Sequence, residues 1–266
     1  MKHAIITGGS SGIGKAVAKL LASEGANISI IARDADKLEV ARQEIIAVTA
    51  SSQQKILSFV ADVASLEKVT EAIDNAIAKQ GTPDLLITSA GIAIPGYFDD
   101  ISLDTFERTM RVNYFGSLYC VKAVLPAMKA ARKGNIVFIS SGAGLIGLFG
   151  YTAYSPSKFA LRGLAESLRG ELKLYNIKVA IVYPPDTDTP QLAAENQTKP
   201  PETKAITATA DTWSAAGVAQ EIIKGIKNNH FAIAPGLEIT ILNRFHSIIA
   251  PLLNKYFDRL VLKIRK

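Results

Sequence analysis

Cysteine and histidine are scarce in this sequence, and long apolar runs are missing. Its 266 residues include one cysteine, Cys120, and three scattered histidines, His3, His230 and His246. A single cysteine excludes an internal disulfide framework, and the dispersed histidines argue against a metal site. No stretch of about 18 apolar residues occurs, so no ordinary membrane-spanning helix is expected. The first residues lack the apolar segment of a secretory signal. We therefore expect a cytoplasmic protein.

The composition is that of a globular protein with an uneven distribution of charge. Apolar residues make up 48% and charged residues 20%, which excludes a disordered chain and a coiled coil. The net charge is +6. The segment from Arg244 to the end holds six basic residues and one acidic residue, so it carries nearly all of that excess. A basic tail on a nearly neutral body is weak evidence for nucleic-acid binding, and we expect none.

Short β-branched runs alternate with helical segments along the chain. In one such segment Leu66, Val69, Ile73 and Ile77 repeat every three or four residues, which predicts one apolar helix face. Strands that are apolar throughout and separated by helices indicate a parallel sheet covered on both faces. We predict one doubly wound, Rossmann-like α/β domain over residues 1–236, with about seven strands. The predicted strands are His3–Thr7, Asn27–Ile31, Ile56–Val60, Leu85–Thr88, Asn135–Ser140, Lys178–Tyr183 and Phe231–Ala234.

One interval interrupts this alternation. Five prolines and many threonines lie between Pro184 and Trp213, with few large apolar residues. A long irregular segment in a compact domain is usually a binding loop, so we predict a substrate lid over about residues 185–213. The alternative is a surface loop without function.

A glycine-rich segment follows the first predicted strand and precedes a helix predicted at Lys15–Glu24. Its spacing, G-x-x-x-G-x-G, differs from the commoner dinucleotide-binding pattern G-x-G-x-x-G. Glycines at this position permit a tight turn and bring backbone amides to a pyrophosphate, which the positive end of the helix also attracts. The candidate phosphate-binding residues are Gly8, Ser10, Ser11, Gly12, Ile13 and Gly14.

The residues after the second predicted strand indicate which dinucleotide binds. An acidic side chain there would hold the ribose hydroxyl of NAD. This chain has Arg33 at that place and Lys37 one turn later, and two cations favour the extra phosphate of NADP. In the alternative interpretation Arg33 is an ordinary surface residue and Asp34 takes the ribose.

A tyrosine and a lysine stand four residues apart in a segment that predicts a helix running to about Tyr175. Tyr154 and Lys158 would share one helix face, where the ammonium would lower the pKa of the phenol. Such a phenol can donate a proton to a ketone that is being reduced. Ser141 ends the fifth predicted strand, where its hydroxyl could bind the carbonyl oxygen. The neighbouring Ser140 is an alternative that side-chain alternation would turn away.

Taken together, these motifs resemble the short-chain dehydrogenase/reductase family over the chain through residue 235. The resemblance implies that Asn113 joins Ser141, Tyr154 and Lys158 in catalysis, and that Lys158 also holds the nicotinamide ribose. The family more often has asparagine where Ser89 stands and glycine where Pro185 stands. Further cofactor contacts that the resemblance implies are Asp62, Val63, Ala90, Gly91, Pro184, Thr187 and Thr189.

A narrower resemblance, carried by residues 148–154, 159–166 and 183–200, is to the 3-ketodihydrosphingosine reductases. It implies NADPH-dependent reduction of the ketone of a long-chain sphingoid base, whose cationic amine could pair with Asp186 or Asp188. Alternatives are another lipid-like ketone (a steroid, a retinoid or a 3-oxoacyl thioester) or, more remotely, a regulatory dinucleotide-binding protein without catalysis. Family resemblance also implies a homo-oligomer through helices around residues 104–131 and 152–175.

The last segment, 237–266, departs from the compact family pattern. Large apolar residues repeat every three or four positions from Phe245 onward, interleaved with the basic residues counted above. This predicts a basic amphipathic helix that is bent or interrupted at Pro251. Such a helix can lie in the interface of an anionic membrane, here the cytoplasmic face. It can equally pack on the domain or on another subunit.

Overall fold

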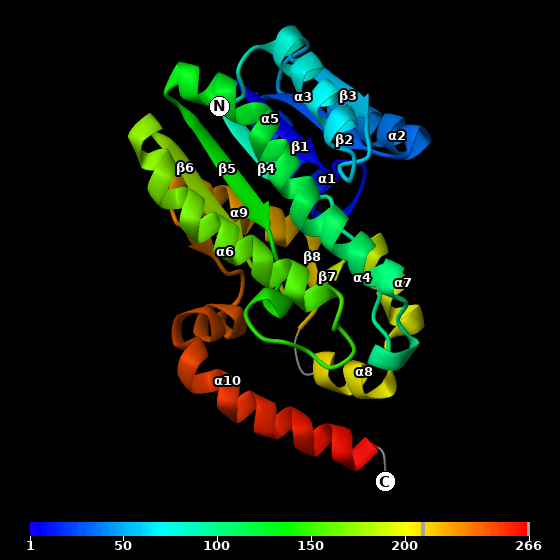
Figure 1. Ribbon diagram of the computed structural model, residues 1–266. Coiled ribbons are helices and arrows are strands. Elements are labelled where there is room, and N and C mark those ends of the chain that lie inside the picture. The colour runs from blue at the N-terminus through cyan, green and yellow to red at the C-terminus, as the bar shows by residue number, and fades with distance from the viewer. Residues whose placement is uncertain (209–210, 265–266) are drawn as a thin grey trace.

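A parallel sheet forms the centre of the computed structural model, which describes residues 1–208 and 211–264 (Figure 1). Within these ranges the sheet has seven strands in the order β3-β2-β1-β4-β5-β6-β9, and every neighbouring pair is parallel. The predicted fold class is confirmed, and every predicted strand limit agrees with the structure to within one residue. The strands are β1 (His3–Thr7), β2 (Asn27–Ala32), β3 (Ile56–Val60), β4 (Leu85–Thr88), β5 (Gly134–Ile139), β6 (Ile177–Val182) and β9 (Ala232–Ile233).

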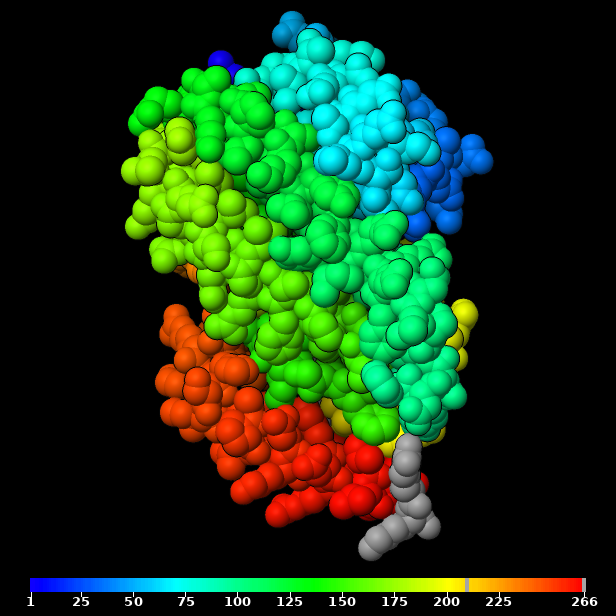
Figure 2. Space-filling model, viewed as in Figure 1, coloured from blue at the N-terminus to red at the C-terminus, as the bar shows by residue number. Residues whose placement is uncertain are grey.

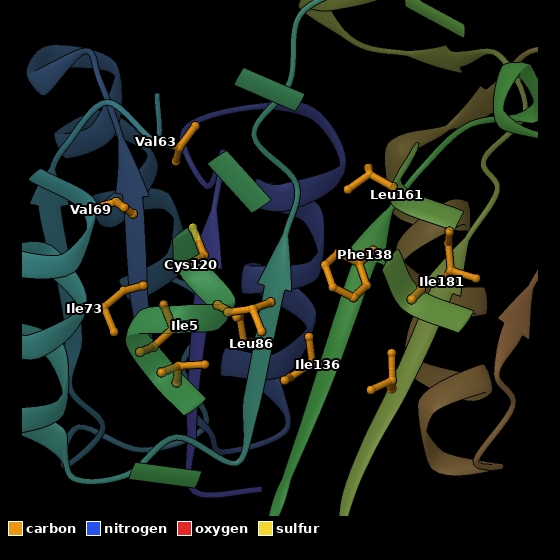
Figure 3. Close-up of a cluster of buried hydrophobic side chains, with 14 of the residues drawn as sticks. Ile5, Val63, Val69, Ile73, Leu86, Cys120, Ile136, Phe138, Leu161 and Ile181 are labelled. Carbon is orange, nitrogen blue, oxygen red and sulfur yellow. The ribbon is translucent and has the colours of Figure 1, made fainter. Parts of the chain in front are cut away.

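Helices cover both faces of this sheet because successive side chains of each strand point to opposite sides. Figure 3 shows one of the two cores, where Ile5, Leu86 and Phe138 of three strands meet Ile73 and Cys120 of the covering helices. The alternate strand residues pack against α1, α2 and α9 on the other face. The helices of the two layers are α1 (Gly12–Ser23), α2 (Ala35–Ile46), α3 (Leu66–Gln80), α5 (Gly116–Ala131), α6 (Tyr154–Leu172) and α9 (Ala215–Lys227).

Strand order reverses between β1 and β4, which are neighbours in space although two strands separate them in the sequence. In a sheet of this kind the ligand site lies beyond the carboxyl ends of the strands at such a switch point. Several short elements lie in the connections on this side: a 3₁₀ turn at Phe98–Asp100, α4 (Leu103–Met110), a π-helical turn at Arg111–Phe115 and a 3₁₀ turn at Gly142–Gly144.

The segment predicted to be an irregular lid is in fact largely helical. It contains β7 (Thr187–Asp188), α7 (Pro190–Thr198), α8 (Pro201–Thr207) and β8 (Trp213–Ser214), and β7 pairs with β8. Prolines led to the wrong prediction, because Pro190 and Pro201 stand at the starts of the two helices. There a missing amide costs no helical hydrogen bond. Residues 209–210 of the predicted lid lie outside the described residues.

The C-terminal segment forms α10 (Leu237–Ile264), which is bent. The bend is at Phe245, whose backbone is non-helical, and not at Pro251 as predicted. Packing decides its place, because Leu242 before the bend is buried against the domain and the part after it contacts α8. Figure 2 shows α10 as an orange-to-red band across the lower end of the molecule. Residues 265–266 of the predicted tail lie outside the described residues.

No helix within residues 1–208 and 211–264 combines enough length with enough apolar character for a membrane crossing.

Candidate active site

A cavity of about 1070 Å³ opens at the carboxyl ends of the strands. Its walls come from the glycine turn, the ends of β2, β4 and β5, the start of α6, the lid and α10. Residues far apart in the sequence therefore meet in one place. Most of the predicted site residues line this cavity, and the exceptions are Gly14, Asp62, Asn113 and Asp188.

The glycine turn places the start of α1 at the cavity. Gly8 has a φ of +68°, and a Cβ there would lie 2.7 Å from the backbone nitrogen of Ala90, so only glycine fits between β1 and the β4 connection. The helix begins at Gly12, three residues before the predicted start. Ser11 is its N-cap, but the Ser11 side chain makes no capping hydrogen bond. The first amides of α1 and this hydroxyl are thus placed to bind a phosphate.

Arg33 is exposed at the edge of the cavity, directly after β2. The neighbouring Asp34 is the N-cap of α2, because its Oδ1 accepts the backbone N–H of Lys37 at 3.0 Å. Its Oδ2 also lies 3.2 Å from the Lys37 ammonium. These contacts hold the pKa of Asp34 below its usual value. Because this carboxylate is engaged in capping, the geometry favours Arg33 over Asp34 as the residue that meets the adenosine ribose.

Of the other cofactor contacts that the family resemblance implies, some line the cavity and others do not. Val63 lines the cavity, whereas the Asp62 carboxylate accepts the backbone N–H of Ala64 at 3.0 Å and closes a local turn. Ala90 and Gly91 follow β4 and form part of the wall. Pro184, Thr187 and Thr189 line it from the beginning of the lid.

Tyr154 is the first residue of α6, and its side chain is buried in the cavity wall. The side chains of Ser141 and Gln191 act on the pKa of its phenol as hydrogen-bonding groups. Ser140 does not compete for this position, since its hydroxyl donates to the Lys158 carbonyl at 3.0 Å. Ser141 and Tyr154 therefore present two hydroxyl groups to the same part of the cavity.

Lys158 lies one turn after Tyr154 on the face of α6 that the i,i+4 spacing predicts. Its ammonium is 5.5 Å from the centre of the Tyr154 ring and donates to the Ile139 carbonyl at 3.0 Å. Burial lowers the pKa of Lys158 to about 8, although the negative charge of Glu195 acts in the opposite direction.

The expectation that this ammonium lowers the pKa of the phenol is wrong for the structure described. Burial raises the pKa of Tyr154, and the charge of Glu195 raises it further. The hydrogen bonds from Ser141 and Gln191 act in the opposite direction but are weaker than burial. Because the wall excludes water, phenolate is disfavoured, and the hydroxyl keeps its proton at neutral pH.

Asn113 lies in the π-helical turn and is fully buried. Its amide donates to the Ile92 carbonyl at 3.0 Å and to the Ser157 hydroxyl at 2.9 Å, and its oxygen accepts the Ile92 N–H at 2.8 Å. A Cβ on Gly91 would lie 3.3 Å from the Asn113 oxygen and 3.6 Å from the Lys158 nitrogen. These two polar atoms are therefore neighbours, and glycine leaves room for both.

Three lid and loop residues complete the site without having been predicted as site residues. Glu195 of α7 is buried, and its two oxygens accept hydrogen bonds from Tyr151 at 2.6 Å and from Gln191 at 2.8 Å. The Tyr151 and Tyr154 rings are 5.5 Å apart. A signal was present in the sequence, because Thr189 and Pro190 form a typical helix start and place Gln191 and Glu195 on one face.

The two carboxylates proposed for a substrate amine are less well placed. Asp186 lines the cavity, but it lies 3.5 Å from the buried ammonium of Lys199. Asp188 is exposed and is not among the lining residues.

One wall of the cavity is apolar. It includes Leu148 and Ile206 near the lid and Ile239, Leu242 and Phe257 of α10. The C-terminal segment therefore forms part of the cavity wall rather than a separate appendage.

Comparison with known proteins agrees with this arrangement. A family described as short chain dehydrogenase matches residues 2–200. The chain is 45% identical to a 3-ketodihydrosphingosine reductase of Bos taurus over 250 residues, which is 94% of this chain and 75% of that protein. It is 47% identical over 235 residues to a 3-dehydrosphinganine reductase of Danio rerio, covering 88% and 71% of the two chains. A crystal structure of a short chain dehydrogenase/reductase from Burkholderia phymatum in complex with NAD shares the fold. Its TM-score is 0.81 and its identity 23%, over 91% of this chain and 92% of that one.

Proposed function

Since the chain belongs to the short-chain dehydrogenase family, we propose that it reduces the ketone of a long-chain sphingoid base, converting 3-ketodihydrosphingosine to dihydrosphingosine with NADPH. The observation that carries this proposal is its 45% identity, over 94% of its length, to a relative with that reductase name. The fold places the chain among oxidoreductases that act on a ketone or hydroxyl group. An apolar wall beside two hydroxyl groups supports a ketone on a long alkyl chain.

The residues of the cavity fit a dinucleotide with an extra phosphate. The open start of α1 and the Ser11 hydroxyl would hold the pyrophosphate, and Arg33 would hold the 2′-phosphate. Lys158 would bind the nicotinamide ribose. When bound, NADPH supplies a hydride to the carbonyl carbon.

The protein's own groups would act on the carbonyl oxygen. Ser141 would donate a hydrogen bond to that oxygen as negative charge develops on it, and Tyr154 would transfer its phenolic proton to complete the alcohol. A phenol that is protonated at neutral pH suits the reductive direction. Lys158 would return a proton to the phenol, and Asn113, whose side-chain oxygen also lies beside Gly91, would join that relay.

The direct test is NADPH oxidation with three substrates. We expect 3-ketodihydrosphingosine to be reduced with a kcat/KM about 10-fold or more above that of a steroid ketone or an acetoacetyl thioester, because only the sphingoid ketone combines an alkyl chain with an amine. Good turnover of either competitor, with none of the first substrate, would exclude the sphingoid assignment and leave a general ketone reductase.

We also propose that α10 attaches the protein to an anionic membrane surface. After the bend, Ile249, Leu253 and Phe257 pack partly on the domain. Ile248 and Leu252, on an adjacent stripe of the same helix, remain 69% and 63% exposed. Membrane attachment and packing on the domain, posed as alternatives by the sequence, are therefore compatible. The exposed stripe is accompanied by Arg244, Lys255, Arg259 and Lys263, all exposed.

Replacing Ile248 and Leu252 together by serine should reduce co-sedimentation with anionic vesicles several-fold, because about two large side chains no longer enter the interface. The change spares Phe257 and Leu242, which line the cavity, so turnover of a detergent-dispersed substrate should persist. Leu174→Ser is a matched control, since Leu174 is 74% exposed and lies in the 3₁₀ turn that follows α6, outside α10. Equal vesicle binding by all three proteins would rule out this surface as the attachment site.

A further inference from the structure

We infer that Glu195 is the residue that recognises the amine of the substrate, by pairing its carboxylate with the ammonium group next to the ketone. This inference rests on the proposed function, because it assigns the part of the site that distinguishes an amine-bearing ketone from other ketones. Of the two carboxylates considered from the sequence, Asp188 does not line the cavity, and Asp186, which does, is paired with Lys199.

The Glu195 carboxylate has an unusual environment. The residue is 7% exposed and lines the same cavity as Tyr154. Its hydrogen-bond donors, the Tyr151 hydroxyl and the Gln191 amide, are both neutral. Among the described residues no lysine, arginine or histidine forms an ion pair with it. A buried carboxylate without a cationic partner is costly, and a cationic ligand would offset that cost.

The two buried lysines of the site, Lys158 and Lys199, each have another partner. Lys199 of the lid is buried and lies 3.5 Å from the Asp186 carboxylate. The Lys158 ammonium donates to the Ile139 carbonyl. The charge of Glu195 therefore remains available to the cavity, and its field reaches the catalytic groups, since it raises the pKa values of both Tyr154 and Lys158.

The Glu195 carboxylate also has a suitable position relative to the phenol that would meet the carbonyl oxygen. In a 2-amino-3-ketone the ammonium is carried by the carbon next to the carbonyl, so its binding group must lie close to the phenol that meets the carbonyl oxygen. Gln191 donates to Glu195 at 2.8 Å, and the same side chain acts on the pKa of the Tyr154 phenol. The Tyr151 ring stacks 5.5 Å from the Tyr154 ring while its hydroxyl holds Glu195. Two independent side chains thus connect the carboxylate to the phenol.

The acidic residues that line the cavity differ in their burial and in their partners. Among the described residues three carboxylates line it: Asp34, Asp186 and Glu195. Asp34 caps α2 at the cofactor end, and Asp186 is paired with Lys199. Glu195 alone of the three is both buried and without a cationic partner.

The test compares two substrates on the Glu195→Gln variant, which keeps the shape of the side chain but removes its charge. One substrate is 3-ketodihydrosphingosine, and the other is the same ketone with hydrogen in place of the amine. We expect kcat/KM for the amine substrate to fall about 10- to 100-fold, mainly through KM, because a charged hydrogen bond is lost. For the deaminated ketone we expect kcat/KM to stay within about 3-fold, since that substrate makes no such bond.

The second substrate separates recognition from a general electrostatic effect. If Glu195 acted only by adjusting the pKa of Tyr154, both substrates would change alike, and that result would overturn the inference. Unchanged kinetics for both substrates would overturn it too. Asp211→Asn is the matched control, because it removes an exposed lid carboxylate that does not line the cavity, and both substrates should then behave as with the wild type.

Two further measurements keep the outcome interpretable. NADPH affinity of Glu195→Gln should equal that of the wild type, which shows that the variant is folded. Should the variant not fold, the wild type itself decides, because it should prefer the amine substrate over the deaminated ketone by about 10-fold or more. Equal use of both ketones would overturn the inference while leaving sphingoid-ketone reduction in place. No reduction of the amine substrate at all would remove the proposed function as well.

Discussion

Replacing Tyr154 by phenylalanine should lower kcat about 10²- to 10⁴-fold while leaving NADPH affinity nearly unchanged. A fall in kcat of this size is typical of the removal of a general acid. The phenol is the proton donor in the proposed reaction, and it is buried in the cavity wall, where the Ser141 and Gln191 side chains act on its pKa. Phenylalanine keeps the ring packed against Tyr151 but has no proton to transfer. Steady-state NADPH oxidation and a fluorescence titration with NADPH measure the two quantities.

A control for this variant is Tyr119→Phe on α5. Tyr119 is partly buried and contacts the Phe115 ring, but it does not line the cavity, so its loss of a hydroxyl should leave kcat unaltered. If Tyr154→Phe retained turnover within a few-fold of the wild type, the proton would come from another group. The proposed role of the tyrosine would then be abandoned.

Replacing Arg33 by alanine should raise the dissociation constant of NADPH about 10- to 100-fold and change that of NADH by less than about 3-fold. A hydrogen-bonded contact with a charged group contributes about 1.5 to 3 kcal/mol, and only NADPH has a 2′-phosphate to receive it. Arg33 stands exposed at the cavity edge, where water and salt screen it and place the effect toward the lower end of the range. Lys37→Ala should have a smaller effect, because Lys37 already pairs with Asp34 at 3.2 Å.

Arg42→Ala is the matched control for cofactor preference. Arg42 is another arginine of the same region, on α2, but its guanidinium pairs with Glu39 and does not line the cavity. It should leave both dissociation constants unaltered. An equal loss of affinity for NADPH and NADH in Arg33→Ala would show that the arginine does not select the phosphate.

Much of the fold could be predicted because its signals are local. A run such as Leu85–Thr88 is apolar at three successive positions before its threonine, a pattern typical of a strand buried on both faces. The 3–4–4 spacing of Leu66, Val69, Ile73 and Ile77 lies in α3, as predicted. The two prolines of the lid show the limit of such reasoning. Pro190 and Pro201 start helices, whereas Pro126 and Pro251 lie inside α5 and α10, and composition alone does not distinguish these positions.

The candidate site, like the fold, could be predicted from the sequence only in part. The spacing of Tyr154 and Lys158 was enough to place them on one helix face, but it gave the wrong direction for the pKa of the phenol. That pKa depends on how completely α6, the lid and the β5 connection exclude water, and on a carboxylate 41 positions later in the chain. Glu195 was visible in the sequence as one acidic residue among several near the lid.

By itself, the sequence determined the alternating α/β architecture, the glycine turn, the cation at the end of β2 and the tyrosine–lysine pair, because each of these depends on neighbours within one strand or one helical turn. The tertiary structure alone decided which acidic residue is buried in the same cavity wall as Tyr154, which way the pKa of the phenol shifts and where α10 bends. Those properties arise from burial and from contacts between distant segments, and neither is encoded in any short stretch of chain.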